Sequence, residues 1–223
     1  MGILKEQYFS LSSVDETSRR FLEATEKAVR RSHLPSSLNQ SALLVLDMQK
    51  YFLCDTSHAF IPSSTAILPK VNGLISVYRQ SNLPVIFTKH INTPQNAGLM
   101  AAWWKEVLSE GMDLSEIDPR IDTGDGIVII KTRYDAFINS SLDGILSEHK
   151  IRQLVICGVM THLCCETTAR SAFMRDYEVY FTVDGTATYN EAFHQATLLN
   201  LAHGFATPAL ANTIISIAGH NHG

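Results

Sequence analysis

The sequence predicts a three-layer α/β/α fold on a mainly parallel, doubly wound sheet of six strands. Two observations predict this fold. First, short β-branched runs alternate with longer segments of helical periodicity from residue 41 onward, which is the pattern of successive βαβ units. Second, runs such as 42–46 are apolar at consecutive positions, as in strands covered on both faces. We expect one Rossmann-like domain over residues 41–219, preceded by a helical arm over residues 1–40.

The elements follow one another in a regular order. Strands are expected at residues 42–47, 84–89, 127–131, 152–157, 178–183 and 205–209. Helices are expected near residues 65–81, 140–148, 162–176 and 190–203. In the arm, Ser13 to Glu16 resembles a capping box, and the arm is expected to wrap the domain or a neighbouring subunit. Residues 91–123 break the alternation, and an insertion of this length is typical of a lid or substrate wall.

Composition narrows the function classes. The chain has 223 residues, 45% of them hydrophobic, and a formal net charge of −4. Without a basic stripe, nucleic-acid binding has no electrostatic support. No apolar run approaches the ~20 residues of a membrane span, and the N-terminus lacks the apolar centre of a signal peptide. Four cysteines, two of them adjacent, do not form a disulfide framework. We therefore expect a cytoplasmic protein that acts on a small molecule.

Three strand ends carry chemically active side chains. Asp47 ends the first apolar run, Lys131 ends the run 127–130, and Cys164 follows the run 154–157 and a glycine. Because the carboxyl ends of parallel strands meet at one edge of a sheet, these side chains are expected to converge. Charged residues also commonly mark where any strand leaves the core, but three such endings with complementary chemistry favour an active site.

The three side chains form a plausible set for nucleophilic catalysis. A cysteine on the first turn of a helix feels the positive end of the macrodipole, which favours the thiolate. Asp47 is expected to take the thiol proton and return it to the leaving group, while Lys131 lowers the thiol pKa and keeps Asp47 ionised. Backbone N–H groups at Met160 and Cys164 are expected to stabilise an oxyanion. Most cysteines, however, are inert core residues.

Other side chains are candidates for substrate contact. Gln49 lies two residues beyond Asp47 and therefore on the same face of the chain. Phe52, Trp104 and Tyr134 are candidates for lining an apolar pocket for a planar or cyclic substrate, although aromatic residues more often serve packing. We also expect Thr161, which is placed to cap the helix that carries Cys164, to lie at the substrate site.

Taken together, these segments resemble the isochorismatase-like cysteine hydrolases. The matching pieces are LLVLDMQKYF from Leu43, KTRYDAF from Lys131, GVMTHLCCETTAR from Gly158, AFMRDY from Ala172 and VDGTAT from Val183. They span roughly residues 41 to 210. This superfamily includes nicotinamidases, N-carbamoylsarcosine and ureidoacrylate amidohydrolases, and isochorismatases.

The resemblance implies several further features. The family carries a cis peptide between the residues that match Val159 and Met160. It usually assembles as dimers or tetramers, so a homo-oligomer is expected. His162 matches a histidine of isochorismatases, and His90 stands where they carry a substrate-binding glutamine, so both are expected to contact the substrate.

Nicotinamidases bind a divalent metal through an Asp-x-His pair and a second histidine, but this chain has Lys-His-Ile-Asn over residues 89–92. His220 and His222 are spaced as in a weak metal tract, although a polar tail is the simpler interpretation. We expect neither metal nor cofactor.

Three functions remain open from the sequence. The first is covalent hydrolysis of a small amide or ureido compound by Cys164. The second is isochorismatase activity, in which Asp47 acts as general acid on a vinyl ether and the thiol is a spectator. The third is a non-catalytic binding or assembly subunit, against which the intact Asp47, Lys131 and Cys164 argue, because such a set is costly to bury without a use.

Overall fold

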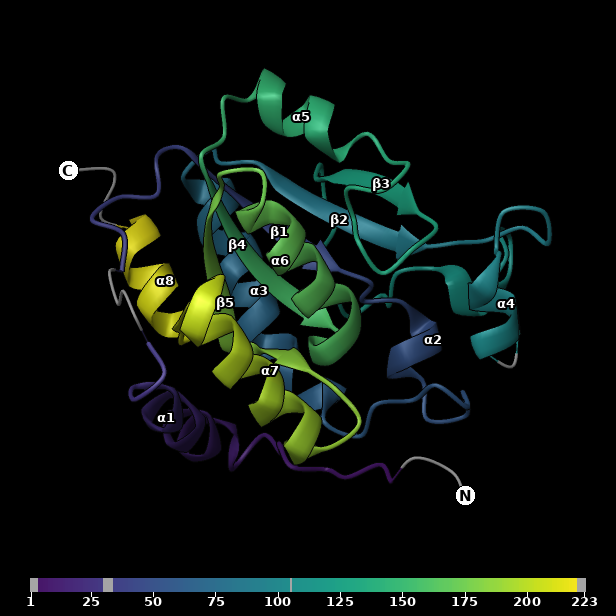
Figure 1. Cartoon of the computed structure of the whole chain (residues 1–223), viewed down its shortest axis with the longest axis horizontal. Helices are drawn as coiled ribbons and strands as arrows, with labels where there is room; N and C mark the ends of the chain where they lie inside the picture. Colours follow the sequence, from purple (N-terminus) through teal and green to yellow (C-terminus); the bar gives the residue numbers. More distant parts are fainter. Residues whose placement is uncertain (1–3, 30–33, 105, 220–223) are drawn as a thin grey trace.

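The computed structural model describes residues 4–29, 34–104 and 106–219 and confirms the predicted α/β fold (Figure 1). Within these residues, six strands form one entirely parallel sheet in the order β3-β2-β1-β4-β5-β6. The strands are β1 (Ser41–Leu46), β2 (Val85–His90), β3 (Ile127–Lys131), β4 (Gln153–Val159), β5 (Glu178–Ala187) and β6 (Thr207–Ala209). The order runs outward in both directions from the central pair β1 and β4, so the sheet is doubly wound.

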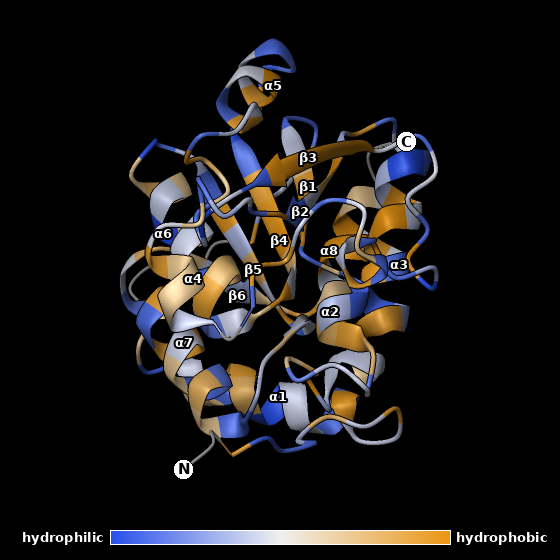
Figure 2. Cartoon of the chain, turned by 90° about the vertical axis from the view of Figure 1, so that its right-hand side faces the viewer, coloured by the Kyte–Doolittle hydropathy of each residue, from blue (hydrophilic) through white to orange (hydrophobic). Residues whose placement is uncertain are grey.

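Helices cover both faces of the sheet. α3 (Ser64–Gln80) and α8 (Ala211–Gly219) pack against each other on one face. α6 (Glu166–Phe173) and α7 (Glu191–Gly204) cover the other face, and in Figure 1 they lie in front of the sheet with α3 behind it. α5 (Leu142–Glu148) follows β3 at the edge. Hydrophobic colouring marks β3 and much of β4, and the helices carry both colours (Figure 2).

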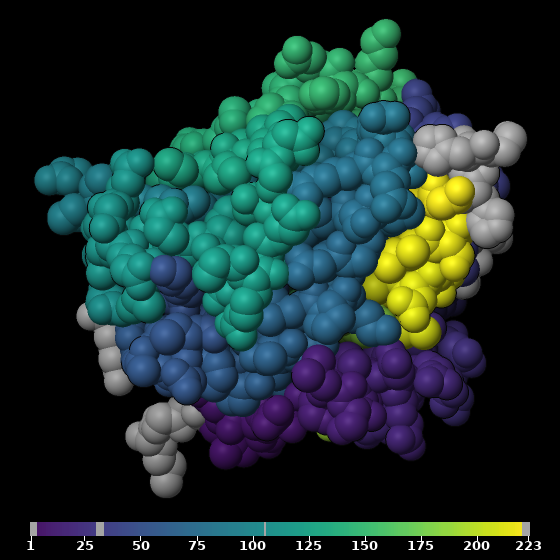
Figure 3. All heavy atoms as spheres, turned by 180° about the vertical axis from the view of Figure 1, so that it is seen from behind, coloured from purple at the N-terminus to yellow at the C-terminus, as the bar shows by residue number. Residues whose placement is uncertain are grey.

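The described part of the N-terminal arm packs on its own domain. α1 (Val14–Thr25) contacts α7, β5 and β6. Phe9, Val14 and Phe21 are buried in the same hydrophobic core as the sheet. Seen from behind, the N-terminal segment lies along the lower edge of the molecule beside the segment that precedes α3 (Figure 3).

Several elements differ from the sequence prediction. α8 was not expected, because its three isoleucines favour strands as much as helices; Ala211, Ile214 and Ala218 nevertheless form a buried stripe at helical spacing. The helix expected from residue 162 begins as a π-helical turn, Thr161–Cys165. Shorter elements also occur: α2 (Lys50–Leu53), α4 (Leu99–Trp103) and a 3₁₀ turn, Asp113–Ser115. No helix among the described residues has the length and apolar character needed to cross a membrane.

The two central strands approach each other very closely where they deliver the site. Gly158 of β4 has a φ of 108°, and a Cβ added there would lie 2.1 Å from the carbonyl oxygen of Leu46. Only glycine permits both this conformation and this contact. Asp47 follows Leu46 directly and itself has a positive φ of 50°. The carboxyl ends of β1 and β4 are thereby held together.

Candidate active site

Asp47, Lys131 and Cys164 meet at the carboxyl edge of the sheet. Asp47 follows β1, Lys131 is the last residue of β3, and Cys164 lies in the π-helical turn after β4. Lys131 Nζ is 2.8 Å from Asp47 Oδ2 and donates a hydrogen bond of 3.3 Å to Cys164 Sγ. Asp47 and Lys131 are fully buried, and Cys164 is 4% exposed. The lysine therefore bridges the carboxylate and the thiol.

Lys131 reaches the centre from the edge strand β3 by extending over β2. His90 of β2 is its register partner, and its ammonium also donates to the Arg133 carbonyl at 2.9 Å and lies 3.4 Å from His90 Nδ1. Burial alone would lower the pKa of Lys131, but the Asp47 carboxylate and the hydrogen-bond acceptors outweigh burial and raise it above its ordinary value. Lys131 is a permanent cation at neutral pH.

Thr88, which was not predicted as a site residue, orients Asp47. The Thr88 hydroxyl donates to Asp47 Oδ1 at 2.5 Å and accepts from the Asp47 backbone N–H at 3.0 Å. Oδ2 makes no well-aligned hydrogen bond within the described chain apart from its ion pair, so it is available to accept a proton. The signal in the sequence is a hydroxyl side chain in the otherwise apolar run Val85-Ile86-Phe87-Thr88.

The surroundings of Cys164 disfavour its thiolate, whereas a thiol activated by the helix N-terminus would have a lowered pKa. Burial and the Asp47 carboxylate raise the pKa of Cys164 to about 12, and Lys131 lowers it without offsetting them. The adjacent Cys165 is fully buried in the core, and burial raises its pKa too. A thiol in this position needs a neighbouring base, and the Asp47 carboxylate is suitably placed.

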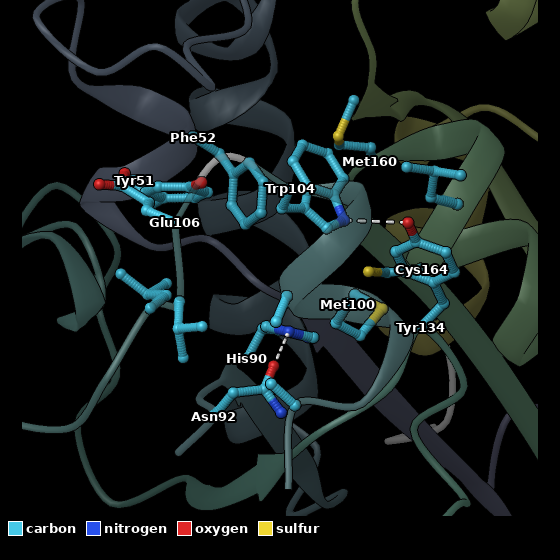
Figure 4. A pocket seen from close by; sticks show the side chains of 15 residues that line it. Tyr51, Phe52, His90, Asn92, Met100, Trp104, Glu106, Tyr134, Met160 and Cys164 are labelled. Carbon is cyan, nitrogen blue, oxygen red and sulfur yellow. Dashed lines mark hydrogen bonds between the residues drawn. The ribbon is translucent and has the colours of Figure 1, made fainter. Parts of the chain in front are cut away.

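A cavity opens onto Cys164 (Figure 4). Four of the predicted substrate residues line it, namely Phe52, His90, Trp104 and Tyr134. The Trp104 indole N–H donates to the Tyr134 hydroxyl at 3.0 Å. Eleven further residues line the cavity without having been predicted to contact the substrate. They are Tyr51, Asn92, Ala97, Met100, Ala101, Glu106, Val107, Leu108, Met160, Leu163 and the nucleophile candidate Cys164 itself. Most come from residues 91–123, whose predicted role as a substrate wall this placement supports.

His90 is a neutral polar group in the cavity wall. Its Nε2 lies 2.8 Å from Asn92 Oδ1, and its Nδ1 faces the Lys131 ammonium. Nδ1 is therefore the acceptor and Nε2 carries the proton. Burial and the charge of Lys131 lower the pKa of His90 to about 4, so the ring stays uncharged at neutral pH.

Three predicted substrate residues do not reach the cavity. The amide of Gln49 is occupied by backbone groups, because it donates to the His90 and Ser115 carbonyls and accepts from the His90 N–H. Thr161 and His162 face α7 instead, because the π-helical turn rotates them away from Cys164. Thr161 Oγ1 is 3.1 Å from His194 Nδ1. Thr161 also does not cap the helix, since Met160 holds the N-cap position.

The residues at the site do not suit a metal ion. The described residues contain no group of three or more His, Cys, Asp or Glu side chains placed to hold one. His90, where a metal-binding histidine would be sought, has both ring nitrogens engaged by Asn92 and Lys131. No reaction step is therefore assigned to a metal. His220 and His222 lie outside the described residues.

The backbone at the turn that carries Cys164 is unusual. The peptide bond between Val159 and Met160 is cis. The Met160 carbonyl accepts hydrogen bonds from the N–H groups of Leu163 and Cys165, and Met160 also lines the cavity. The turn thus presents Met160 and Cys164 to the same space.

Comparison with known proteins defines the class as a hydrolase. The isochorismatase domain family matches residues 41–213. Nicotinamidase 3 of Arabidopsis thaliana is 40% identical over 82% of this chain and 90% of its own length. Enterobactin synthase component B of Escherichia coli K12 is 30% identical over 73% of this chain, which spans only 58% of that protein. The chain belongs to the isochorismatase family.

Solved structures agree with this assignment at the level of the fold. A cysteine hydrolase from Pseudomonas syringae pv. phaseolicola superposes with a TM-score of 0.81 over 87% of this chain and 99% of its own, at 24% identity. An N-carbamoylsarcosine amidase from Thermoplasma acidophilum gives a TM-score of 0.69 over 78% of this chain and 99% of its own, also at 24% identity.

Proposed function

We propose that the protein is a thiol-dependent hydrolase of a small, uncharged amide or ureido compound. The observation that carries the proposal is the buried cluster in which Lys131 bridges Asp47 and Cys164 at the base of the cavity. The 40% identity to a protein named nicotinamidase 3 supports the same chemistry.

The reaction begins with attack of Cys164 on the amide carbonyl carbon. Because the resting thiol is protonated, Asp47 Oδ2 removes its proton as the C–S bond forms. The oxyanion receives hydrogen bonds from the backbone N–H groups of Met160 and Cys164. Asp47 then passes the proton to the amide nitrogen, the C–N bond breaks, and an amine or ammonia leaves behind a thioester.

Hydrolysis of the thioester repeats the sequence with water. Asp47 takes a proton from the water as its oxygen attacks the thioester carbon. The tetrahedral adduct expels the Cys164 sulfur, which recovers the proton from Asp47 and releases the carboxylic acid. Lys131 stays charged throughout and stabilises negative charge on Asp47 Oδ2 and on the sulfur, both of which it contacts.

The cavity favours an uncharged substrate. Glu106 is the charged side chain among the described lining residues, His90 is neutral, and no Lys or Arg of the described chain lines the wall. An organic dianion such as isochorismate normally needs cationic partners to replace its lost hydration. The apolar side chains of Phe52, Trp104 and Leu163 line the cavity and suit a flat ring or acyl group.

Isochorismate hydrolysis is the second candidate. The 30% identity to enterobactin synthase component B and 28% identity to an isochorismatase of Bacillus subtilis favour it. In that reaction Asp47 would protonate the vinyl ether, and Cys164 would have no covalent role.

Replacing the nucleophile separates the two candidates. Cys164→Ala is expected to abolish turnover of the uncharged amide nicotinamide, measured by release of ammonia. Cys165→Ala, which removes the neighbouring buried thiol, is the matched control and should keep that activity. Retained amide hydrolysis by Cys164→Ala would refute the covalent mechanism. Isochorismate cleavage that survives Cys164→Ala, with no amide turnover by the wild type, would establish the second candidate instead.

A further inference from the structure

A buried polar chain lies behind the nucleophile's turn, on the side away from the cavity. Thr161 Oγ1 is 3.1 Å from His194 Nδ1 of α7, and His162 Nδ1 is 2.5 Å from Thr188 Oγ1. Thr161, Thr188 and His194 are fully buried. The two residues that follow Met160 are therefore both held from outside the proposed substrate site.

The hydroxyl of Tyr8, in the N-terminal arm, joins these two attachments. It lies 3.0 Å from His194 Nδ1 and accepts a hydrogen bond of 2.9 Å from the Thr188 backbone N–H. The Tyr8 hydroxyl oxygen thus contacts both His194, which bonds Thr161, and Thr188, which bonds His162. Tyr8 is separated from these residues by about 150 to 190 positions in the sequence, so only the folded arm brings it there.

An aromatic cage fixes the His194 ring. The rings of Tyr8, Phe9 and Phe21 surround it with centroid distances of 5.2, 5.3 and 5.2 Å. All the cage residues belong to the arm, and Phe9 and Phe21 are at most 1% exposed. Burial lowers the pKa of His194 to about 3, so the ring is neutral. Its Nδ1 lies within hydrogen-bond distance of both hydroxyls and, in the Nε2–H tautomer, accepts from one of them.

We propose that Tyr8 and His194 are positioning residues that clamp the Met160–Cys164 turn from behind, so that the N-terminal arm sets the geometry of the nucleophile and of the oxyanion donors. This proposal rests on the proposed function. Neither residue touches the cavity, so the clamp acts on the transition state and leaves ground-state binding unchanged. A displacement of about 1 Å at reacting atoms can cost 10²-fold in rate.

Tyr8→Phe tests the clamp with the smallest possible change. It removes the hydroxyl alone and leaves the ring in the cage. Tyr78→Phe is the matched control, because Tyr78 is fully buried and its hydroxyl bonds Ser41 at 3.0 Å, at the start of β1 and far from the site. Loss of one buried hydrogen bond corresponds to about a fivefold to tenfold effect. We expect kcat to fall by about that factor in Tyr8→Phe with KM unchanged, and Tyr78→Phe to keep the wild-type kcat.

A second pair of variants asks whether the acceptor on His194 matters. His194→Asn places an amide oxygen near the position of Nδ1 and is expected to keep most of the activity. His194→Leu fills the same cage without an acceptor and should lose kcat to the same extent as Tyr8→Phe. Equal activity in the Asn and Leu variants overturns the role of the acceptor. A kcat for Tyr8→Phe equal to that of Tyr78→Phe, or a rise in KM at constant kcat, overturns the clamp.

Hydrogen exchange provides a readout that needs no substrate. The peptide covering residues 159–166 should exchange faster in Tyr8→Phe than in wild type, and at the wild-type rate in Tyr78→Phe. Unchanged exchange in Tyr8→Phe overturns the clamp whatever the activity. If the wild type hydrolyses no amide while the exchange accelerates as expected, the proposed function fails and the clamp stands.

Discussion

Asp47→Asn is expected to make Cys164 more reactive toward an alkylating agent while abolishing turnover. In the wild type, burial and the Asp47 carboxylate raise the pKa of the Cys164 thiol, so its thiolate fraction at pH 7.5 lies below the roughly 10% of an ordinary cysteine. Lys131 does not offset them, because its charge is already paired with Asp47. Without the Asp47 charge, the thiolate becomes the counter-ion of Lys131.

The size of the effect follows from the distance between lysine and sulfur. At 3.3 Å and an effective dielectric of about 20, the attraction between two unit charges is about 5 kcal/mol. In the wild type the Asp47 carboxylate largely cancels this attraction. Removing the carboxylate charge therefore raises the ratio of thiolate to thiol by as much as ~10³, since each ~1.4 kcal/mol is tenfold. We expect alkylation to accelerate by about 10²-fold or more.

The assay is the rate of iodoacetamide labelling of each cysteine at pH 7.5, followed by mass spectrometry. Cys54 is partly exposed and lies outside the cavity lining, so it should label at the same rate in both proteins and serve as internal reference. Lys131→Met should instead slow the labelling of Cys164. Labelling of Cys164 in Asp47→Asn at or below the wild-type rate would refute the view that Asp47 keeps the thiol protonated.

Four further predictions follow from the same contacts. Lys131→Met leaves the Asp47 charge buried without its partner, so urea denaturation at pH 7 should show a loss of about 3–5 kcal/mol in unfolding free energy. Thr88→Val removes the hydrogen bond to Asp47 and should lower kcat by about tenfold or more at constant KM in steady-state assays, as expected for a bond to a charged group. Glu106→Gln should raise kcat/KM for an amide carrying a carboxylate by about threefold to tenfold relative to a neutral amide, because repulsion at the cavity wall is lost. In the folded protein the pKa of His194 is lowered to about 3, whereas the unfolded chain protonates it near pH 6.5. This group should therefore lower the unfolding free energy by about 3 kcal/mol as the pH drops from 6.5 to 4. In urea denaturation at several pH values, the unfolding free energy of His194→Asn should depend less steeply on pH than that of the wild type.

Much of the architecture was predictable because it depends on local pattern. The six strands and the helices α3, α5, α6 and α7 were expected within a few residues of their observed bounds. α8 was missed because a short, isoleucine-rich segment carries no strong periodic signal before its packing partner α3 is known. The segment 91–123 gave no periodic signal either, and its side chains lie on the cavity because of long-range contacts such as that between Gln49 and Ser115.

The side chains at the site also divide into those whose placement the sequence predicted and those whose placement it did not. The sequence by itself determined that Asp47, Lys131 and Cys164 lie at one sheet edge, because parallel strands deliver their carboxyl ends together. Only the tertiary structure decided that Lys131 crosses β2 to join the other two and that Thr88 orients the carboxylate. Burial, a property of the whole fold, raises the pKa of the Cys164 thiol, whereas the helix position by itself predicted a lowered one. Thr161 and His162 were expected to contact substrate from their nearness to Cys164 in sequence, but a π-helical turn directs them toward α7 and the N-terminal arm. Adjacency along a chain fixes which residues share a turn, whereas the direction of each side chain depends on backbone geometry and on partners far away in the sequence.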